Sequence, residues 1–213
     1  MADQQKQKVL GIFCHPDDEI LSGWPIFQSD EYEKYLIICC SDAERNRPNR
    51  KVALQEVCKQ ENINLVYCLD IPNDFYALPT RRADYLLTHA VDYIEQHLKK
   101  AVETINPDFI MTHNPVGEYG HGSHRLLFEI VSQLEYIRKQ KIIITDICQK
   151  SNHRSHNEIP RAVKWAYYNN MKRRGCSLDY NFYKRCKLIY DKYSAWTWCY
   201  DPIAECNLWA IET

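Results

Sequence analysis

Short, continuously apolar runs that alternate with helical patterns constrain the fold of this chain most strongly. The apolar runs lie at Val9–Cys14, Tyr35–Cys40, Leu65–Leu69, Phe109–Met111 and Ile142–Ile144. Apolar residues at helical spacing occupy Lys51–Asn62 and Ala83–Ile105, and Asn106-Pro107-Asp108 is expected to end the second helix. Strands that are apolar along their whole length are typical of a parallel sheet covered on both faces. The pattern therefore predicts a doubly wound α/β fold.

The order of the strands in that sheet predicts where a ligand would bind. We expect a single Rossmann-like domain over residues 1–213, with a mainly parallel sheet of strand order 3-2-1-4-5 flanked by helices. The winding then reverses between the first and fourth strands, and ligands in such sheets bind at this reversal. The loops after Cys14 and Met111 are therefore the predicted site.

Both of these loops carry residues suited to metal chemistry. The first begins with His15-Pro16-Asp17-Asp18-Glu19, and the second contains Gly117-Glu118-Tyr119-Gly120-His121-Gly122-Ser123-His124. Three of the chain's 6 glycines fall in the second loop, which predicts tight turns there. His113, at the end of the fourth strand, is interpreted as a packing residue or a residue behind the site.

A catalytic zinc site takes three protein ligands and leaves a fourth position for water. His15, Asp18 and His124 can supply this set. Bound zinc lowers the pKa of its water towards about 7, and Asp17 is placed to accept the water's proton. His121 can stabilise the oxyanion of a tetrahedral intermediate as an imidazolium, and can later protonate an amine leaving group.

Composition excludes several other classes of protein. Lys plus Arg (27) nearly balance Asp plus Glu (28), so bulk charge gives no support for a nucleic-acid partner. No apolar segment approaches the roughly 18 residues that span a bilayer. Among the 10 cysteines there is no C-x-x-C pair, and the polar stretch Met1–Lys8 is unlike a signal peptide. We expect a soluble, cytoplasmic protein with free thiols.

The H-P-D-D-E block together with the distal G-E-Y-G-H-x-x-H resembles the PIG-L/LmbE-like superfamily of zinc-dependent N-deacetylases, which remove acetyl groups from N-acetylglucosamine-type sugars. The resemblance extends over about the first 140 residues. It implies that His15, Asp18 and His124 bind Zn²⁺ (or another divalent metal such as Fe²⁺), that Asp17 is the general base and that His121 stabilises the oxyanion. It also implies the Rossmann-like fold.

Three positions depart from the usual family pattern. Ser123 replaces the acid of the distal H-P-D-H block. His121 therefore lacks the neighbouring carboxylate that would favour its charged form. Gly23 and bulky Trp24 stand where glycines are common, and Ala53 replaces an acid that often follows the Arg50 position. Substrate contacts are expected to differ while the metal chemistry is kept.

Candidate substrate contacts follow the second and third strands. Arg50 is the preferred partner for a phosphate or carboxylate, ahead of Arg45 and Arg47. Asp42, and either Asn73 or Asp74, are candidates to bind sugar hydroxyls. Their alternative role is turn formation. Among the aromatic residues that could stack on a sugar ring (Trp24, Phe75, Tyr76 and Tyr119), only Tyr119 belongs to a motif, and packing is the alternative role of all four.

The leading hypothesis is a zinc-dependent hydrolase that removes an N-acyl group, most simply acetyl, from an amino sugar or a nucleotide-linked or other sugar conjugate, with zinc-bound water as the nucleophile. Two alternatives stay open: a hydratase or other amide hydrolase at the same metal site, and a non-catalytic metal-containing binding protein. The choice between monomer and homo-oligomer also stays open. Beyond residue 150, only Asp179–Tyr193 shows clear helical spacing, and Ile159–Asn170 fits either a strand or a helix.

Overall fold

The computed structural model of the chain describes residues 5–40, 49–71, 81–138, 141–147, 164, 166, 168–199 and 201–210, with the backbone alone at 81–88, 138 and 141. Its strands are β1 (Gln7–Phe13), β2 (Tyr32–Ile38), β3 (Ile63–Cys68), β4 (Phe109–Thr112), β5 (Lys141–Thr145), β6 (Lys172–Ser177) and β7 (Glu205–Ala210). Its helices are α1 (Asp18–Leu21), α2 (Trp24–Phe27), α3 (Asn49–Gln60), α4 (Arg81–Ile105), α5 (Gly117–Gly120), α6 (Gly122–Gln133), α7 (Glu135–Arg138) and α9 (Tyr180–Lys192).

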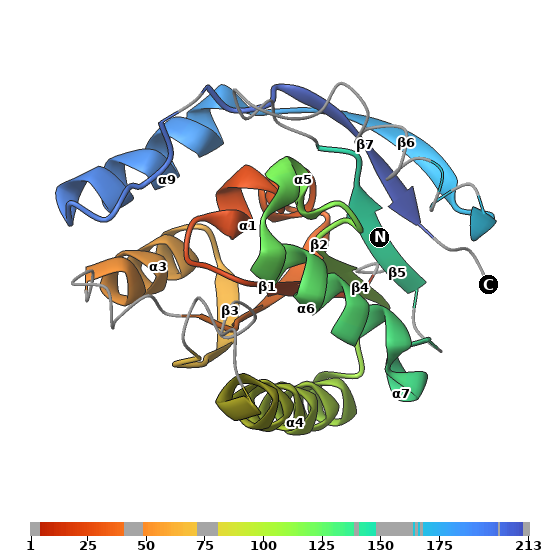
Figure 1. Cartoon of the computed structure of the whole chain (residues 1–213). Helices are drawn as coiled ribbons and strands as arrows, with labels where there is room; N and C mark the ends of the chain where they lie inside the picture. The colour runs from red at the N-terminus through yellow and green to blue at the C-terminus, as the bar shows by residue number, and fades with distance from the viewer. Residues whose placement is uncertain are drawn as a thin grey trace.

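The seven strands form one mixed sheet of order β3-β2-β1-β4-β5-β7-β6 (Figure 1). β3, β2, β1, β4 and β5 run parallel, which confirms the predicted order and the doubly wound α/β class. The prediction was incomplete at the far edge, where β7 pairs antiparallel with β5 and with β6. β6 reads Lys-Arg-Arg-Gly-Cys-Ser, so a search for apolar runs does not find this mostly exposed edge strand.

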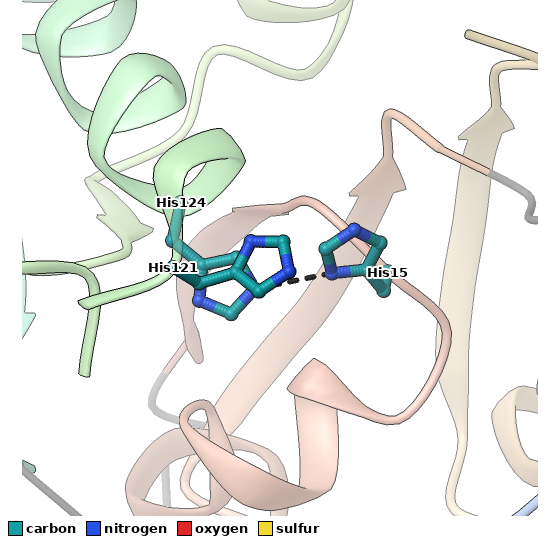
Figure 2. Close-up of side chains that lie close together, drawn as sticks. All are labelled: His15, His121 and His124. Carbon is teal, nitrogen blue, oxygen red and sulfur yellow. Dashed lines mark hydrogen bonds between the residues drawn. The ribbon is translucent and has the colours of Figure 1, made fainter. Parts of the chain in front are cut away.

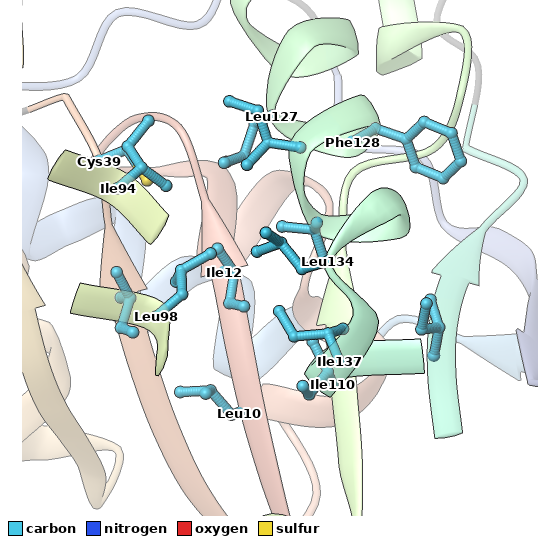
Figure 3. Packing of buried hydrophobic residues seen from close by; sticks show 14 of the residues in the cluster. Leu10, Ile12, Cys39, Ile94, Leu98, Ile110, Leu127, Phe128, Leu134 and Ile137 are labelled. Atoms are coloured by element: carbon cyan, nitrogen blue, oxygen red, sulfur yellow. The ribbon is translucent and has the colours of Figure 1, made fainter. Parts of the chain in front are cut away.

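Alternating side chains of the central strands build a core on each face of the sheet. Leu10 and Ile12 of β1 belong to one cluster with residues of α4, α6 and α7, and Figure 3 shows Ile12 between Leu98 of α4 and Leu134. Val9 and Phe13 belong to the opposite cluster, which contains apolar residues of α1, α2, α3 and α9. Each central strand is therefore buried on both faces, which explains its continuous apolar sequence.

α9 confirms the helical pattern predicted for Asp179–Tyr193. Asp179 caps its N-terminus by accepting a hydrogen bond from the Asn181 N–H at 2.8 Å. Its buried stripe packs into the same cluster as α1 and α2 and contains Phe182, Cys186 and Tyr190. Lys164, Ala166 and Tyr168 are helical, which agrees with one of the two alternatives for Ile159–Asn170. No helix within the described residues combines the length and apolar character needed to span a membrane.

Candidate metal centre and active site

The loop after β1 folds back on itself at the predicted ligand-binding edge. The Asp18 N–H donates to the His15 carbonyl at 3.1 Å, and the His15 N–H donates to Asp18 Oδ2 at 2.7 Å. Between them Asp17 has a φ of 95°, in the left-handed region that side chains other than glycine rarely adopt. This tight turn directs the side chains of His15 and Asp18 to the same side.

The loop after β4 also contains the predicted tight turns. Gly117 and Gly120 have φ values of 68° and 84°, and Glu118 has a φ of 55°. Gly122 instead begins α6, which carries His124 in its first turn. Figure 2 shows His121 and His124, from this loop and helix, directed towards His15.

Three donor atoms from these loops converge on one point. His15 Nδ1 lies 3.1 Å from His124 Nε2, and each of these nitrogens lies 3.4 Å from Asp18 Oδ2. A tetrahedral zinc ion with bonds of about 2.0–2.1 Å separates its ligand atoms by roughly 3.3–3.4 Å. The three side chains predicted as ligands therefore have the spacing that a tetrahedral divalent metal requires.

A hydrogen bond to Glu118 fixes which ring nitrogen of His124 carries the proton. Its Nδ1 lies 2.7 Å from Glu118 Oε2, and the pKa of Glu118 is lowered to about 2 because the imidazoles of His113 and His124 outweigh the effect of its burial. An ionised carboxylate only accepts, so His124 Nδ1 carries the proton and Nε2 presents its lone pair. A histidine that donates to a carboxylate behind it is typical of metal sites.

His113 lies close enough to Asp18 and His124 for these three side chains to bind a metal ion together. The hydrogen bonds of His113 argue against such a role. Its Nε2 accepts from the Cys14 N–H at 3.0 Å, and its Nδ1 lies 3.0 Å from Glu118 Oε2. Both ring nitrogens are thus engaged, with the proton on Nδ1. His113 holds Glu118 and the end of β1 in place, in agreement with the interpretation of His113 as a residue behind the site.

Asp17, the predicted base, is buried between two partners from distant segments. Arg50 Nη2 lies 2.8 Å from Asp17 Oδ1, and the Thr197 hydroxyl donates to Asp17 Oδ2 at 3.0 Å. Burial raises the pKa of Asp17 to about 6, against the opposing effect of the Arg50 charge. Asp18 differs: the imidazoles of His124 and His113 outweigh burial and hold its pKa well below the usual range.

The surroundings of His121 favour a neutral ring. Burial, followed by the neighbouring imidazoles of His124 and His15, lowers the pKa of His121 to about 3. Its Nδ1 lies 2.7 Å from the Ser123 hydroxyl, which also lies 3.5 Å from His15 Nε2. Ser123 thus occupies the position of the missing acid and contacts both rings.

The predicted substrate contacts lie in different places. Arg50 is 3% exposed and donates to the Pro16 carbonyl as well as pairing with Asp17, so the structure places it beside the base. The ring centroid of Tyr119 lies 5.4 Å from those of both His121 and His124. Asp42 and Asp74 lie outside the described residues. Substrate binding by all four stays a prediction.

Sequence reasoning missed several residues around the base. Glu118 stood inside a motif and could have been found as the acid nearest to the histidines. Tyr190 donates to Glu19 Oε1 at 2.7 Å, and Thr197 reaches Asp17. The Trp198 ring lies 5.0 Å from that of Tyr119. Nothing local in the sequence around 190–198 indicates these contacts.

Comparison with known proteins extends this description. A family model described as PIG-L: GlcNAc-PI de-N-acetylase matches residues 10–135. The fold resembles the A40926 pseudoaglycone deacetylase Dbv21, with 12% identity, a TM-score of 0.58 and coverage of 96% of this chain and 97% of that chain. It also resembles the zinc-inhibited form of teicoplanin deacetylase Orf2, with 10% identity, a TM-score of 0.59 and coverage of 96% and 97%. No curated protein sequence matches the chain.

Proposed function

The chain belongs to the PIG-L family, whose model matches more than half of it, and from this premise we propose that it is a metal-dependent N-deacetylase acting on an N-acylated amino sugar or sugar conjugate. One observation carries the proposal. The donor atoms of His15, Asp18 and His124 stand 3.1–3.4 Å apart. Asp17, which directly precedes Asp18 in the sequence, adds a second carboxylate at the same turn. Metal ligands and a proton acceptor are the two components that amide hydrolysis by water requires.

The donor set fits a divalent cation. Two imidazole nitrogens and one carboxylate oxygen match the ligand set of catalytic zinc sites. His15 Nδ1 and His124 Nε2 face each other at 3.1 Å while His124 keeps its proton on Nδ1, an arrangement that a shared cation stabilises. When bound, the cation would supply Lewis acidity and make a water molecule more acidic.

The protein's own residues supply the proton transfers. Asp17 accepts the proton of the attacking water, and its contact with Arg50 favours the carboxylate form that this step needs. His121, with Nδ1 against the Ser123 hydroxyl, directs Nε2–H at the developing oxyanion as a neutral donor. This differs from the imidazolium expected from the sequence, and the departing amine then takes its proton from Asp17.

Three observations support an amino-sugar conjugate as substrate. The family description names a GlcNAc-PI de-N-acetylase, and solved structures with the same fold include a complex of a deacetylase with teicoplanin. The ring of Tyr119 lies 5.4 Å from that of His121 and 5.0 Å from that of Trp198, so aromatic surface that could contact a sugar ring lies next to the proposed oxyanion donor. The acyl group is proposed to be acetyl, because the named relatives are deacetylases.

Metal content and one isosteric variant test this function. Purified protein is expected to bind about one divalent cation per chain, and reconstitution with Zn²⁺, Co²⁺ or Fe²⁺ identifies the most active ion. A solved relative in a zinc-inhibited form makes a titration with excess zinc part of this experiment. Acetate released from a panel of N-acetylated sugars and sugar conjugates is the readout.

The decisive variant is Asp17→Asn, which keeps the shape of the base and removes its proton affinity. It is expected to keep the metal and to lose about 1,000-fold or more of the deacetylation rate, the scale of a positioned general base. His124→Ala should lose the metal as well as the activity, and so distinguishes the two roles. An Asp17→Asn protein that deacetylates at the wild-type rate would contradict the assignment of Asp17 as the general base.

A further inference from the structure

The backbone of the proposed base is held in an unfavourable conformation. Asp17 has a φ of 95°, which costs of the order of 1 kcal/mol for a side chain other than glycine. Such a conformation persists only where surrounding contacts fix it. The Asp17 N–H donates to Glu19 Oε2 at 2.9 Å, and the Glu19 side chain is fully buried. Glu19 therefore stabilises the strained turn from inside the molecule.

Glu19 is in turn fixed by a residue from the other end of the chain. The Tyr190 hydroxyl of α9 donates to Glu19 Oε1 at 2.7 Å across 171 positions of sequence, and Tyr190 is fully buried. The two oxygens of Glu19 thus receive one donor each, from Asp17 and from Tyr190. The contact orients the carboxylate that holds the base.

The backbone of Tyr190 provides a second connection to Asp17. The chain leaves α9 through Ser194, with a φ of 53°, and the Ala195 N–H donates to the Tyr190 carbonyl at 2.8 Å. This turn leads the chain to Thr197, whose hydroxyl donates to Asp17 Oδ2. Tyr190 is thus linked to the Asp17 N–H through Glu19, and its carbonyl fixes the turn that precedes Thr197.

Tyr190 lies well beyond residues 10–135, which match the family. We propose that Tyr190 is a positioning residue of the active site, acting through Glu19 to hold the Asp17 backbone in its catalytic conformation. The inference rests on the proposed function, because it takes Asp17 to be the general base. It assigns a role in catalysis to α9, which contributes none of the proposed metal ligands.

The test compares two tyrosines of the same helix. Tyr190→Phe removes only the hydroxyl that contacts Glu19. Tyr183→Phe removes a hydroxyl about two turns earlier on the same face of α9, from a ring whose centroid lies 5.9 Å from that of Trp196. For Tyr190→Phe we expect kcat to fall about tenfold, the scale of leaving one buried acceptor without its donor, with KM and metal content unchanged. Tyr183→Phe should match the wild type.

Amide hydrogen exchange of the metal-free protein gives a readout that does not depend on activity. Tyr190→Phe should speed exchange at the Asp17 N–H about tenfold, because its acceptor loses its orientation, and Tyr183→Phe should not. A double variant Glu19→Ala/Tyr190→Phe should be no slower in catalysis than Glu19→Ala alone, since Tyr190 acts through Glu19.

The outcomes separate this inference from the proposed function. If Tyr190→Phe merely lowers the melting temperature, with kcat and Asp17 exchange like those of Tyr183→Phe, the inference is overturned. Additive losses in the double variant would overturn it as well. If the wild type deacetylates nothing, the proposed function fails. The exchange rate at Asp17 still decides whether Tyr190 fixes this turn, and unchanged exchange refutes the connection whatever the catalytic result.

Discussion

The segment matched by the family and the segment beyond residue 170 contribute different things to the site. Residues 10–135 contain the proposed ligands His15, Asp18 and His124, as well as the proposed base Asp17. The later segment, with β6, α9 and β7, supplies Tyr190 and Thr197, which contact Glu19 and Asp17. The first segment contains the proposed ligands and base, whereas the second adds contacts to Asp17 and Glu19 from a distant part of the chain.

The proposed ligands and the proposed base depend on different parts of the fold. The ligand geometry depends on two loops at the carboxyl ends of adjacent parallel strands, β1 and β4, whose register is fixed by the sheet. The base depends additionally on side chains from an independent helix and the turn after it. Changes in the later segment are therefore expected to alter rate and substrate contacts without removing the metal.

The largest effect is expected from Arg50→Met, in the family segment. Met leaves the buried Asp17 carboxylate without its cationic partner, and breaking such a pair costs about 3–5 kcal/mol of folding free energy. Urea unfolding measures this loss, and deacetylation should fall with it. Arg50→Lys is the control: it keeps the charge and loses the planar fork, so its effect should be smaller. A fully stable Arg50→Met protein would contradict the buried ion pair.

Glu118→Gln should have the next largest effect, and on metal affinity. The amide oxygen of Gln is a weaker acceptor for the His124 Nδ1–H than the carboxylate, and loss of such a partner typically costs about 10–100-fold in affinity. A competition titration with a chromogenic chelator measures it. Glu129→Gln, on the exposed side of α6, is the matched control. Equal affinities of the two variants would refute the role assigned to Glu118.

Most of the fold, and the group of residues that meets at the candidate site, could be predicted because both depend on local patterns. A buried parallel strand needs a continuous apolar run, so the five parallel strands and their order were predicted correctly. His15, Asp17 and Asp18 follow directly after one such strand, and His121 and His124 follow another. The geometry of adjacent parallel strands then brings the two loops together.

The unpredicted features depend on contacts between distant segments. β6 is an exposed edge strand with a charged sequence, and β7 pairs with it antiparallel, so neither has the pattern of a buried parallel strand. Tyr190 has the helical spacing of an ordinary core residue, and only its hydroxyl distinguishes it. The ion pair between Arg50 and Asp17 was not predicted either, because it joins two distant segments and depends on the burial of the Asp17 carboxylate.

A smaller effect is expected at Thr197, in the later segment. Thr197→Val keeps the shape of the side chain and removes the hydroxyl that donates to Asp17 Oδ2, a contact worth about 1 kcal/mol, or roughly a fivefold change in kcat. Thr197→Ser keeps the hydroxyl and should behave like the wild type. Metal content should be unchanged in both. If Thr197→Val instead loses metal, the separation between the two segments is wrong.

The smallest effect concerns how firmly α9 is attached to the family segment. Arg185 of α9 donates two hydrogen bonds to Glu61, just after α3, at 3.0 and 2.9 Å. Burial raises the pKa of Glu61, but the hydrogen bonds from Arg185 and Gln60 outweigh it, so the folded-state pKa lies below the ordinary value. With Arg185 half exposed, solvent limits the pair to about 0.5–1 kcal/mol.

Glu61→Gln should therefore lower the free energy of unfolding by that amount at neutral pH. A depressed pKa in the folded state means that the stabilisation is complete above the unfolded pKa of about 4.3 and is lost as the pH falls through the folded pKa. Urea unfolding of both proteins should differ at pH 7 and converge towards pH 3. A difference that stays constant down to pH 3 would show that Glu61 stabilises the attachment of α9 by packing rather than by charge, and that its carboxylate does not titrate with folding.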